Sequence, residues 1–309
     1  MATRRCDGGV NFDHGAQYFT ARDERFQRYV ASWQQLGLVA TWPDADQQVV
    51  ALDAGRVLRS TESPAPTRYV GVPGMTAIAQ HLSSGLRMQG NTRVGKVSAS
   101  SAGELELHDD QGKRLGNFER VVLALPAPQA ALLLDPESDL ARRLAVVQMQ
   151  PCWATMASFS QRWDVNWCGA FLRDSFLSWA SRNGTKPGRK TSGETLVIHA
   201  TPQWTQQHLE DSDAAAVSQA MLEEFWRVTG IAPQEPDFMQ AHRWRYAIPA
   251  AAQEHGAFAS DDGQIVACGD WCHGARVEGA FLSGQAAAGR LLNACDVVPM
   301  ERMTQLRLF

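Results

Sequence analysis

Apolar side chains recur along this chain with two different periods, which predict where helices and strands lie. Spacings of three and four residues mark amphipathic helices, whereas alternation or a short apolar run between turn residues marks strands. By the first pattern we expect long helices over 23–38 and 213–228, and shorter ones over 72–85 and 139–149. Strand-like segments lie between these helices, so the chain mixes both kinds of element.

The clearest strand signals are paired. Residues 48–58 are typical of a hairpin that turns at Asp53-Ala54-Gly55, because two apolar stretches flank a turn that contains glycine. Residues 92–118 are typical of a small antiparallel meander, since three short strand-like stretches are separated by turn residues. Further strands are expected over 152–159 and 195–200.

Two other segments bear on where a ligand could lie. Arg120–Leu125 is a continuous apolar run, which favours a strand buried on both faces. Basic and aromatic residues alternate after His242, so His242, Trp244 and Tyr246 are expected to share one face of a strand. Buried strands, a meander and helices together predict an α/β fold for part of the chain and an α+β fold for the rest.

Composition narrows the class of protein. With 309 residues and a formal net charge of -4, the chain is long enough for about two domains and has no basic surplus that would point to nucleic acid. No apolar run reaches the roughly 20 residues that a membrane span needs. Polar residues follow the basic start at 1–5, where a signal peptide would be apolar. We therefore expect a cytoplasmic protein without a membrane or nucleic-acid partner.

The cysteines indicate neither a disulfide framework nor a metal centre. The chain has 6 cysteines without regular spacing. Cys268, Cys272 and His273 lie close in sequence, but no second Cys/His pair is near them, as recognised zinc motifs require. We therefore expect no bound metal.

Gly269–Ala288 is the most informative segment. An apolar run over 264–268 leads into a Gly-Asp turn, a short polar loop and a helix of small residues that is expected to open at Gly279-Ala280. Glycine lets a ligand approach the backbone closely, and the unpaired N–H groups at a helix start attract negative charge. The segment therefore predicts a site for a flat, partly anionic ligand.

A second candidate for such close approach is Phe12–Thr20, where Gly15-Ala16 lies between polar and aromatic residues. Alone, this stretch would be an ordinary turn before the first helix. Together with Met1–Arg5 and Gly269–Ala288, it resembles the bacterial renalase-like branch of the FAD-dependent amine oxidase superfamily. Further segments that match the family follow in order between the two ends: Leu125–Ala130, Trp179–Asn183, Lys186–Arg189, Val197–Trp204 and His242–Ala247.

This resemblance implies a two-domain amine-oxidase-like fold, α/β plus α+β, in which both domains are discontinuous. The FAD-binding domain would comprise residues 1–40, 68–135 and 258–295. The substrate domain would comprise residues 41–67 and 136–257, and a tail would follow over 296–309.

The resemblance also implies contacts to FAD. Gly279 and Ala280 would present N–H groups of the helix start to the pyrimidine edge of the flavin, where charge accumulates on reduction. Asp270 would bond to the ribityl or diphosphate region, although a turn-forming role is an open alternative. Val94 is placed near the adenine, or belongs to the core. The full set of expected FAD-binding residues is Arg4, Gly15, Gln17, Tyr18, Val94, Asp270, Val277, Gly279 and Ala280.

Substrate contacts are expected from Trp179, Arg182, His242 and Trp244. An aromatic face suits a nicotinamide ring, and arginine suits its phosphates. The alternative is that these aromatic residues belong to the core and the arginine is solvated. His14 and His199 have no assigned role. Since hydride transfer to flavin needs no covalent nucleophile, no acid–base residue is expected to be essential.

The resemblance implies an FAD-dependent oxidoreductase. Renalase-like proteins pass a hydride from a dihydronicotinamide-type substrate to flavin, with oxygen as the electron acceptor. One alternative is an amine oxidase or desaturase on the same scaffold, which would oxidise a primary amine. Another is a non-catalytic remnant that only binds a partner.

The chain departs from the family at its start. Members begin with a strand, a Gly-x-Gly-x-x-Gly turn and a helix that hold the FAD diphosphate, and no such turn occurs in these 309 residues. Without that βαβ unit, the strand at Arg120–Leu125 would have an exposed apolar edge, and activity would be impaired. Either Met1 is internal to a longer protein, or the chain is a poor flavin binder. The first is favoured, because the resemblance places a Met at this internal position.

Overall fold

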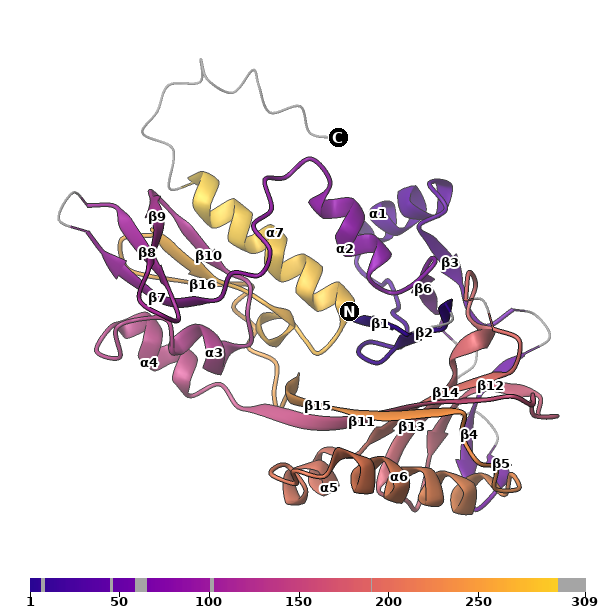
Figure 1. The fold of residues 1–309 in the computed structure, drawn as a ribbon. Helices are drawn as coiled ribbons and strands as arrows, with labels where there is room; N and C mark the ends of the chain where they lie inside the picture. Colours follow the sequence, from indigo (N-terminus) through magenta and orange to yellow (C-terminus); the bar gives the residue numbers. More distant parts are fainter. Residues whose placement is uncertain (7–8, 45–46, 59–65, 101–102, 190, 294–309) are drawn as a thin grey trace. The chain divides into compact units, whose positions relative to one another are not determined.

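The computed structural model describes the chain except for residues 7–8, 45–46, 59–65, 101–102, 190 and 294–309. The chain forms two compact units (Figure 1). Unit 1 comprises Met1–Met88, Gln150–Ile248 and Arg276–Glu278, and unit 2 comprises Gln89–Met149, Pro249–Ala275 and the chain from Gly279 onward. The domains expected from sequence are defined by the ligand that each would bind, so their bounds stay a prediction. The expected tail over 296–309 lies outside the described residues.

Unit 1 is built on a seven-stranded sheet in the order β15-β11-β14-β13-β12-β4-β5. Its strands are β4 (Gln48–Asp53), β5 (Arg56–Leu58), β11 (Met149–Phe159), β12 (Trp167–Leu172), β13 (Leu177–Arg182), β14 (Glu194–Ala200) and β15 (Phe238–Pro249). Strands β11, β14, β13 and β12 pair antiparallel, while β4 joins β12 in parallel. The expected hairpin is confirmed as the antiparallel pair β4–β5.

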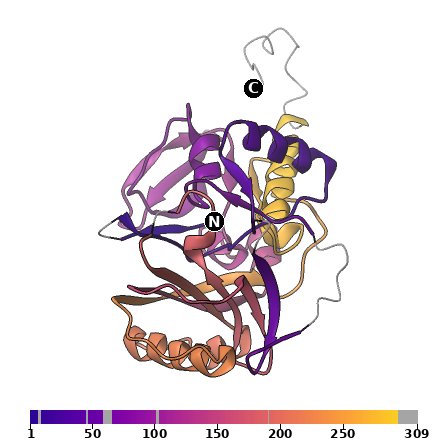
Figure 2. The same ribbon diagram turned by 90° about the vertical axis from the view of Figure 1, so that its right-hand side faces the viewer.

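Helices α5 (Pro202–Gln207) and α6 (Ala214–Thr229) cover one face of this sheet, as Figures 1 and 2 show. Asp213 caps α6 by accepting hydrogen bonds from the N–H groups of Ala215 and Ala216. Gly230 ends it with a φ of 70°, which glycine adopts without strain. The helix expected over 213–228 is therefore confirmed.

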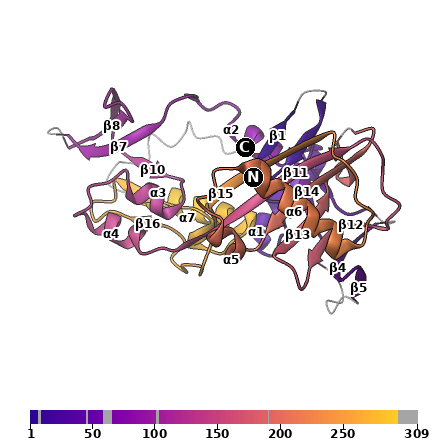
Figure 3. The same cartoon turned by 60° about the horizontal axis from the view of Figure 1, so that its bottom comes forward.

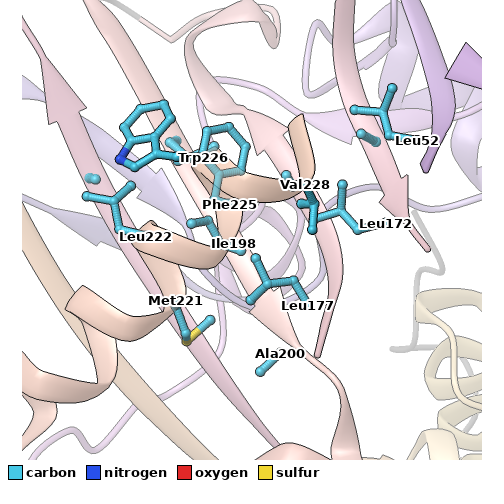
Figure 4. Close-up of a cluster of buried hydrophobic side chains, with 14 of the residues drawn as sticks. Leu52, Leu172, Leu177, Ile198, Ala200, Met221, Leu222, Phe225, Trp226 and Val228 are labelled. Carbon is cyan, nitrogen blue, oxygen red and sulfur yellow. The ribbon is translucent and has the colours of Figure 1, made fainter. Parts of the chain in front are cut away.

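The apolar side of α6 packs on the sheet to form the main core of unit 1 (Figure 4). Met221 and Phe225 are fully buried there, against Leu177 and Ile198 of the sheet. Ile198 and Ala180 also belong to this core, so their strand neighbours His199 and Trp179 lie on the face away from α6. A register shift between Leu177 and Trp179 interrupts the alternation in β13. That face carries the polar and aromatic residues considered below.

The remaining elements of unit 1 lie on this second side (Figure 1). They are β1 (Thr3–Arg5), β2 (Asn11–Asp13), α1 (Glu24–Gln35), β3 (Val39–Thr41), β6 (Tyr69–Gly71), α2 (Ala77–Ser83) and the short 3₁₀ helix η2 (Asn183–Thr185). The first expected helix is confirmed as α1, which Asp23 caps. The helix expected over 72–85 begins only at Ala77. Residues before it form a turn in which Met75 N–H donates to Asp13.

Unit 2 contains the meander β7 (Val94–Ala99), β8 (Leu105–Asp109) and β9 (Arg114–Phe118), which confirms the expectation for 92–118. A second sheet has the order β10-β17-β16, formed by Val121–Leu123, Ile265–Ala267 and Phe258–Ala259. Helices α3 (Ala127–Ala131) and α4 (Asp139–Ala145) lie next to each other (Figure 3). The turn η3 (Asp270–Cys272) precedes the long helix α7 (Val277–Asn293). Helix α4 is shorter than expected, because β11 begins at Met149.

The expectation that Arg120–Leu125 is buried on both faces is wrong. In the described residues β10 has one neighbour, β17, with which it pairs in parallel. Leu123 is buried, but Val122 and Leu125 are 44% and 37% exposed. The exposed edge expected for this strand is therefore present.

The start of α7 also differs from the expectation. The helix begins at Val277, so Gly279 is its third residue rather than its first. Gly279 still lies in the first turn, whose N–H groups lack intrahelical acceptors. No helix in the described part of the chain is long and apolar enough to span a membrane.

Candidate functional site

The predicted site residues fall into two groups, one in each unit. Unit 1 contains Arg4, Gly15, Gln17, Tyr18, Trp179, Arg182, His242, Trp244 and Val277. Unit 2 contains Val94, Asp270, Gly279 and Ala280. Most of the unit 1 group gathers on the side of the large sheet that faces away from α6.

Four aromatic rings form what we call the Tyr18 cluster: Tyr18, Trp42, Phe171 and Trp179. The Trp179 ring lies 5.5 Å from Tyr18, 6.4 Å from Trp42 and 4.8 Å from Phe171, measured between centroids. Gly169 makes room for it, since a Cβ there would lie 2.7 Å from Trp179 and 2.9 Å from Trp42. The two indoles thus pack on β12 only because this strand residue has no side chain.

Two cations cover rings of the Tyr18 cluster. The Arg68 guanidinium lies 5.2 Å from the Tyr18 centroid, and Lys186 Nζ lies 5.7 Å from the Trp42 ring. Trp42 Nε1 donates to Thr185 Oγ1 at 3.2 Å. By contrast, Arg68 Nε and Trp179 Nε1 are buried without an acceptor among the described residues. Buried donors usually have a partner, so this cluster offers two N–H groups to a ligand with acceptors.

Beside these rings lies a buried ion cluster, the Asp13 cluster, made of Asp13, Lys186 and Arg189. Arg189 donates two hydrogen bonds to Asp13 Oδ2, and Lys186 Nζ is 3.6 Å from the same oxygen. Thr3 Oγ1 and Met75 N–H donate to the other oxygen at 2.6 and 3.0 Å. Burial alone would raise the pKa of Asp13, but the two cations and these hydrogen bonds lower it. The carboxylate therefore stays charged, and both of its oxygens already have partners within unit 1.

Among the described residues, Lys186 is the most completely buried basic side chain. Its side chain is 0% exposed, and burial lowers its pKa to about 8 against the opposing pull of Asp13. Nζ also donates to Gln17 Oε1 at 3.1 Å and to Asn183 Oδ1 at 3.3 Å. A lysine with this pKa is mostly charged at neutral pH, so it adds positive potential beside Trp42.

Gln17 links this ion cluster to His199. Its Nε2 donates to the carbonyls of Asp13 and Gly15 and lies 3.4 Å from His199 Nε2. The amide is therefore engaged within unit 1. Gly15 is also constrained by the chain itself, because a Cβ there would lie 3.2 Å from Ala2 N.

His14, His242 and Trp244 form a second aromatic group. His242 and Trp244 are in contact at 4.3 Å, which confirms that they share a strand face, and the His14 ring lies 5.3 Å from Trp244. Trp244 Nε1 donates to the His14 carbonyl at 3.0 Å. Burial, with smaller contributions from His242 and Arg4, lowers the pKa of His14 to about 4. Arg4 itself donates to Gln240 Oε1.

The structure gives Arg182 a different environment from the one expected. Its side chain is 10% exposed and its guanidinium bonds to Glu194 at 2.6 and 3.0 Å. The remaining N–H groups donate to the carbonyls of Trp163, Val165 and Trp167. Since all five donors have acceptors in unit 1, none is left for a substrate phosphate. Arg182 is therefore not part of the proposed site.

Two histidines, the buried His14 and the half-buried His199, make unit 1 sensitive to acid. Burial, followed by the charge of Lys186, lowers the pKa of His199 to about 4, as for His14. Below their usual value of 6.5 the unfolded chain binds protons that the folded chain does not, so stability is lost as pH falls from 6.5 toward 4. Each group contributes a slope of about 1.4 kcal/mol per pH unit. Urea unfolding of His199→Gln should therefore lose less stability than the parent between pH 7 and pH 5.

The matched control is His208→Gln, at a surface histidine whose side chain is 38% exposed. It should keep the full slope of the parent protein. Equal slopes for the parent and His199→Gln would contradict the prediction.

In unit 2, Asp270, Gly279 and Ala280 lie in the turn before α7 or at the start of that helix, whereas Val94 lies in β7. Asp270 is half-buried, and burial raises its pKa; its backbone carbonyl accepts hydrogen bonds from His273 and Gly274 N–H at 3.1 and 2.7 Å. Gly279 is buried, whereas Ala280 is exposed. Val94 begins β7 and packs against the core of unit 2, which favours the alternative that it is a core residue.

Val277 and the residue after it belong to unit 1. Glu278 is 6% exposed, and its Oε1 accepts hydrogen bonds from the N–H groups of Arg22 and Asp23 at 2.6 and 2.8 Å. These bonds attach the start of α7 to the segment before α1.

A separate cavity of about 400 Å³ lies between α1 and the segment 66–69. Its lining includes Arg22, Gln27, Gln34 and Tyr69, but none of the predicted site residues. Among the described residues, no group of three or more His, Cys, Asp or Glu is arranged to hold a metal ion.

Sequence reasoning missed several residues that the fold brings to the Tyr18 cluster. Trp42 and Arg68 come from segments with no motif of their own. Lys186 was part of a segment that matched the family, and His199 was noticed without a role. One signal in the sequence could have pointed to them: aromatic and basic residues occur together in several of the segments that match the family.

Comparison with known proteins identifies the family. A family model described as flavin containing amine oxidoreductase matches residues 59–292. A putative protoporphyrinogen oxidase from Exiguobacterium sp. 255-15 is 17% identical, with a TM-score of 0.59 over 77% of this chain and 54% of that one. Cyclohexylamine oxidase from Brevibacterium oxydans IH-35A is 14% identical, with a TM-score of 0.58 over 74% of this chain and 55% of that one.

A structure of putrescine oxidase bound to putrescine is 12% identical, with a TM-score of 0.61 over 96% of this chain and 90% of that chain. At these identities the likeness concerns the fold, which is a mixed α/β fold of the amine-oxidase type. The chain spans about half the length of two of the three structures. It belongs to the flavin-containing amine oxidoreductase family, a family of flavin-dependent enzymes.

Residues of unit 2 suit a flavin, the cofactor that this family implies. Gly274 has a φ of 123°, and nothing lies within 4 Å of the position that its Cβ would take, so the turn before α7 leaves open space. Gly279 lies in the first turn of α7, whose N–H groups lack acceptors within the helix. The open turn and these N–H groups therefore fit such a group.

Proposed function

We propose that this chain belongs to an FAD-dependent oxidoreductase that takes a hydride from a dihydronicotinamide-type substrate, with oxygen as the electron acceptor. Bound FAD would accept the hydride and transfer the electrons to oxygen, which yields hydrogen peroxide. The role of unit 1 is to bind and orient the substrate. Gly274 and Gly279 of unit 2, with Asp270, are the residues proposed to meet the flavin.

The observation that carries this proposal is the pair of unpartnered donors at the Tyr18 cluster. Arg68 Nε and Trp179 Nε1 both need an acceptor, and both side chains contact the Tyr18 ring. A dihydronicotinamide dinucleotide carries a carboxamide oxygen and phosphate oxygens, which are acceptors. A primary ammonium group carries only donors, so it cannot satisfy these two N–H groups.

Charge supports the same choice. Arg68 and Lys186 already lie over the Tyr18 and Trp42 rings, where an ammonium ion would otherwise be attracted. The buried carboxylate of Asp13 is neutralised by Arg189 and Lys186. A cationic amine would therefore meet positive potential, whereas a phosphate-bearing substrate would be attracted.

Replacing Trp179 with phenylalanine tests the donor. The aromatic face stays and the N–H is lost, so the affinity for an isomeric dihydronicotinamide dinucleotide should fall about tenfold. The matched control is Trp42→Phe in the same cluster, whose N–H is satisfied internally by Thr185. Calorimetric titration of both folded variants should show the loss only at Trp179. Equal affinities for the two variants would contradict the assignment.

The reaction itself is tested on protein loaded with FAD under anaerobic conditions. Bleaching of the flavin absorbance by isomeric dihydronicotinamide dinucleotides should be faster than bleaching by a primary amine such as putrescine. The reverse order would instead establish the amine oxidase alternative. Failure to bind either flavin or the dinucleotide would favour the non-catalytic alternative.

A further inference from the structure

The cavity between α1 and the segment 66–69 is large enough for a small molecule. Its volume of about 400 Å³ falls within the roughly 300–1,000 Å³ of pockets that hold such ligands. Four of its lining residues share one face of α1, since they are spaced by three and four positions along the helix: Gln27, Val30, Ala31 and Gln34. Ala31 has the shortest side chain of the four, which leaves room for a ligand against the helix.

Part of the cavity wall is apolar and firmly held. Val30 is 2% exposed, and the Tyr69 ring stacks on Phe19 with 5.7 Å between centroids, so the core of unit 1 supports both side chains. Pro66 adds an apolar ring to the same lining. Side chains of this kind suit the apolar body of a ligand and, at Tyr69, a flat aromatic ring.

The lining also carries a positive charge. Among the described residues, Arg22 is the basic residue of the lining, and neither Asp nor Glu belongs to it. None of the described residues forms a hydrogen bond or an ion pair with the Arg22 guanidinium. The adjacent Asp23 carboxylate is 2.9 Å from the Arg25 guanidinium and caps α1, so it does not neutralise Arg22. An anion in the cavity would therefore meet an uncompensated positive charge.

The backbone of Arg22 is fixed from two sides. Its N–H donates to Glu278 Oε1 at 2.6 Å, and its carbonyl accepts from Gln27 Nε2 at 3.2 Å. Gln27 Nε2 also donates to the Ala21 carbonyl at 3.3 Å. A ligand therefore has to order only the side chain of Arg22, which keeps the entropic cost of binding low.

We propose that this cavity is a binding site for a small aromatic carboxylate, whose charge pairs with Arg22 and whose ring packs between α1 and Tyr69. A carboxylate matches the planar guanidinium, because the two groups can form parallel hydrogen bonds. A neutral compound of the same shape gains only the apolar contacts, and an ammonium compound is repelled. The site is separate from the Tyr18 cluster and needs neither flavin nor turnover.

The probes for this site are 2-naphthoate and 2-naphthamide, which share one ring system and differ in charge. In ¹⁵N–¹H NMR titrations of the full chain, naphthoate should shift amide signals of residues 20–34 saturably. Naphthamide should bind about fivefold more weakly, as expected for the loss of one partly exposed charge pair.

Arg22→Gln tests the charge. It should weaken the binding of naphthoate by about the same fivefold factor and leave the affinity for naphthamide unchanged. The matched control is Arg28→Gln, the same chemical change at an exposed position of α1 that does not line the cavity. It should bind both probes like the parent.

Ala31→Phe tests the position of the site by filling the cavity from α1. Ala31 and its neighbour Ser32 are both exposed, but of the two only Ala31 lines the cavity. Both phenylalanine variants should therefore fold, as thermal unfolding would verify. Ala31→Phe should abolish the binding of naphthoate, whereas Ser32→Phe should keep it.

Three results would each overturn the proposal: naphthoate that does not bind saturably, equal affinities of the parent for the two probes, or unchanged binding in Ala31→Phe. These titrations involve no dihydronicotinamide and no flavin. Their failure would therefore leave the proposed function standing, and failure of the proposed function would leave this site standing.

Discussion

A chain with alanine in place of Gly279 is expected to lose about 1–3 kcal/mol of stability in unit 2 and to bind FAD at least tenfold more weakly. A Cβ at this position would lie 2.1 Å from the Gly274 carbonyl oxygen and 3.1 Å from its carbon. The obstacle is backbone rather than a flexible side chain, so the turn before α7 or the first turn of the helix must move. Either movement displaces the N–H groups proposed to meet the flavin.

Gly284→Ala is the control for this experiment, because it lies in the same helix with nothing within 4 Å of its Cβ position. It should be neutral or slightly stabilising, since alanine favours a helix over glycine by about 0.5–1 kcal/mol. Thermal unfolding and FAD titration of both variants provide the measurement. If Gly279→Ala behaved like Gly284→Ala in both assays, the close packing of this turn would be refuted.

Replacing Asp13 with asparagine should destabilise unit 1 by about 3–5 kcal/mol, the cost of leaving a buried ion pair without one partner. The side chains of Lys186 and Arg189 are 0% and 2% exposed, and no other carboxylate contacts them among the described residues. The asparagine amide would also direct N–H groups at donors. Urea unfolding followed by tryptophan fluorescence measures the loss.

The size of this loss should depend on pH. Because the folded pKa of Asp13 lies below its usual value of 3.8, its stabilisation is complete above pH 3.8 and disappears as pH falls through the lowered value. The two proteins should therefore differ most near neutral pH and converge in strong acid. Asp211→Asn, at an exposed pair with His208, is the surface control and should unfold like the parent. A parent-like unfolding midpoint for Asp13→Asn would contradict the role of the cluster.

The elements that sequence patterns predicted best are those governed by local contacts. Helix α6 has an Asp cap, an apolar stripe and a terminal Gly, all within one stretch of chain. The meander has short strands and turn residues next to one another in sequence. The shared face of His242 and Trp244 followed from strand alternation alone.

The predictions that failed depended on distant parts of the chain. Whether both faces of β10 are covered depends on its neighbours in the sheet, which its own apolar sequence does not specify. Arg182 looked like a ligand for phosphate, but its partners Glu194 and the carbonyls of 163–167 come from other elements. The environment of a charged side chain depends on partners from other segments as much as on its own sequence neighbours.

The candidate site was only partly predictable for the same reason. Tyr18 and Trp179 were expected from family resemblance, and they do come together. Arg68 and Lys186, which decide the charge of that cluster, were not expected as site residues. Their role depends on contacts between segments more than 100 residues apart, such as Lys186 with Asp13 and Gln17.

The Asp13 cluster also bears on how the amino-terminal segment opens. Asp13 bonds to Thr3 in β1, to Met75 beside α2 and to Arg189 beyond η2, so one carboxylate joins three separate parts of unit 1. Releasing residues 1–13 would leave the buried cations Lys186 and Arg189 without their carboxylate at the same time. This segment should therefore open cooperatively with the large sheet and not by itself.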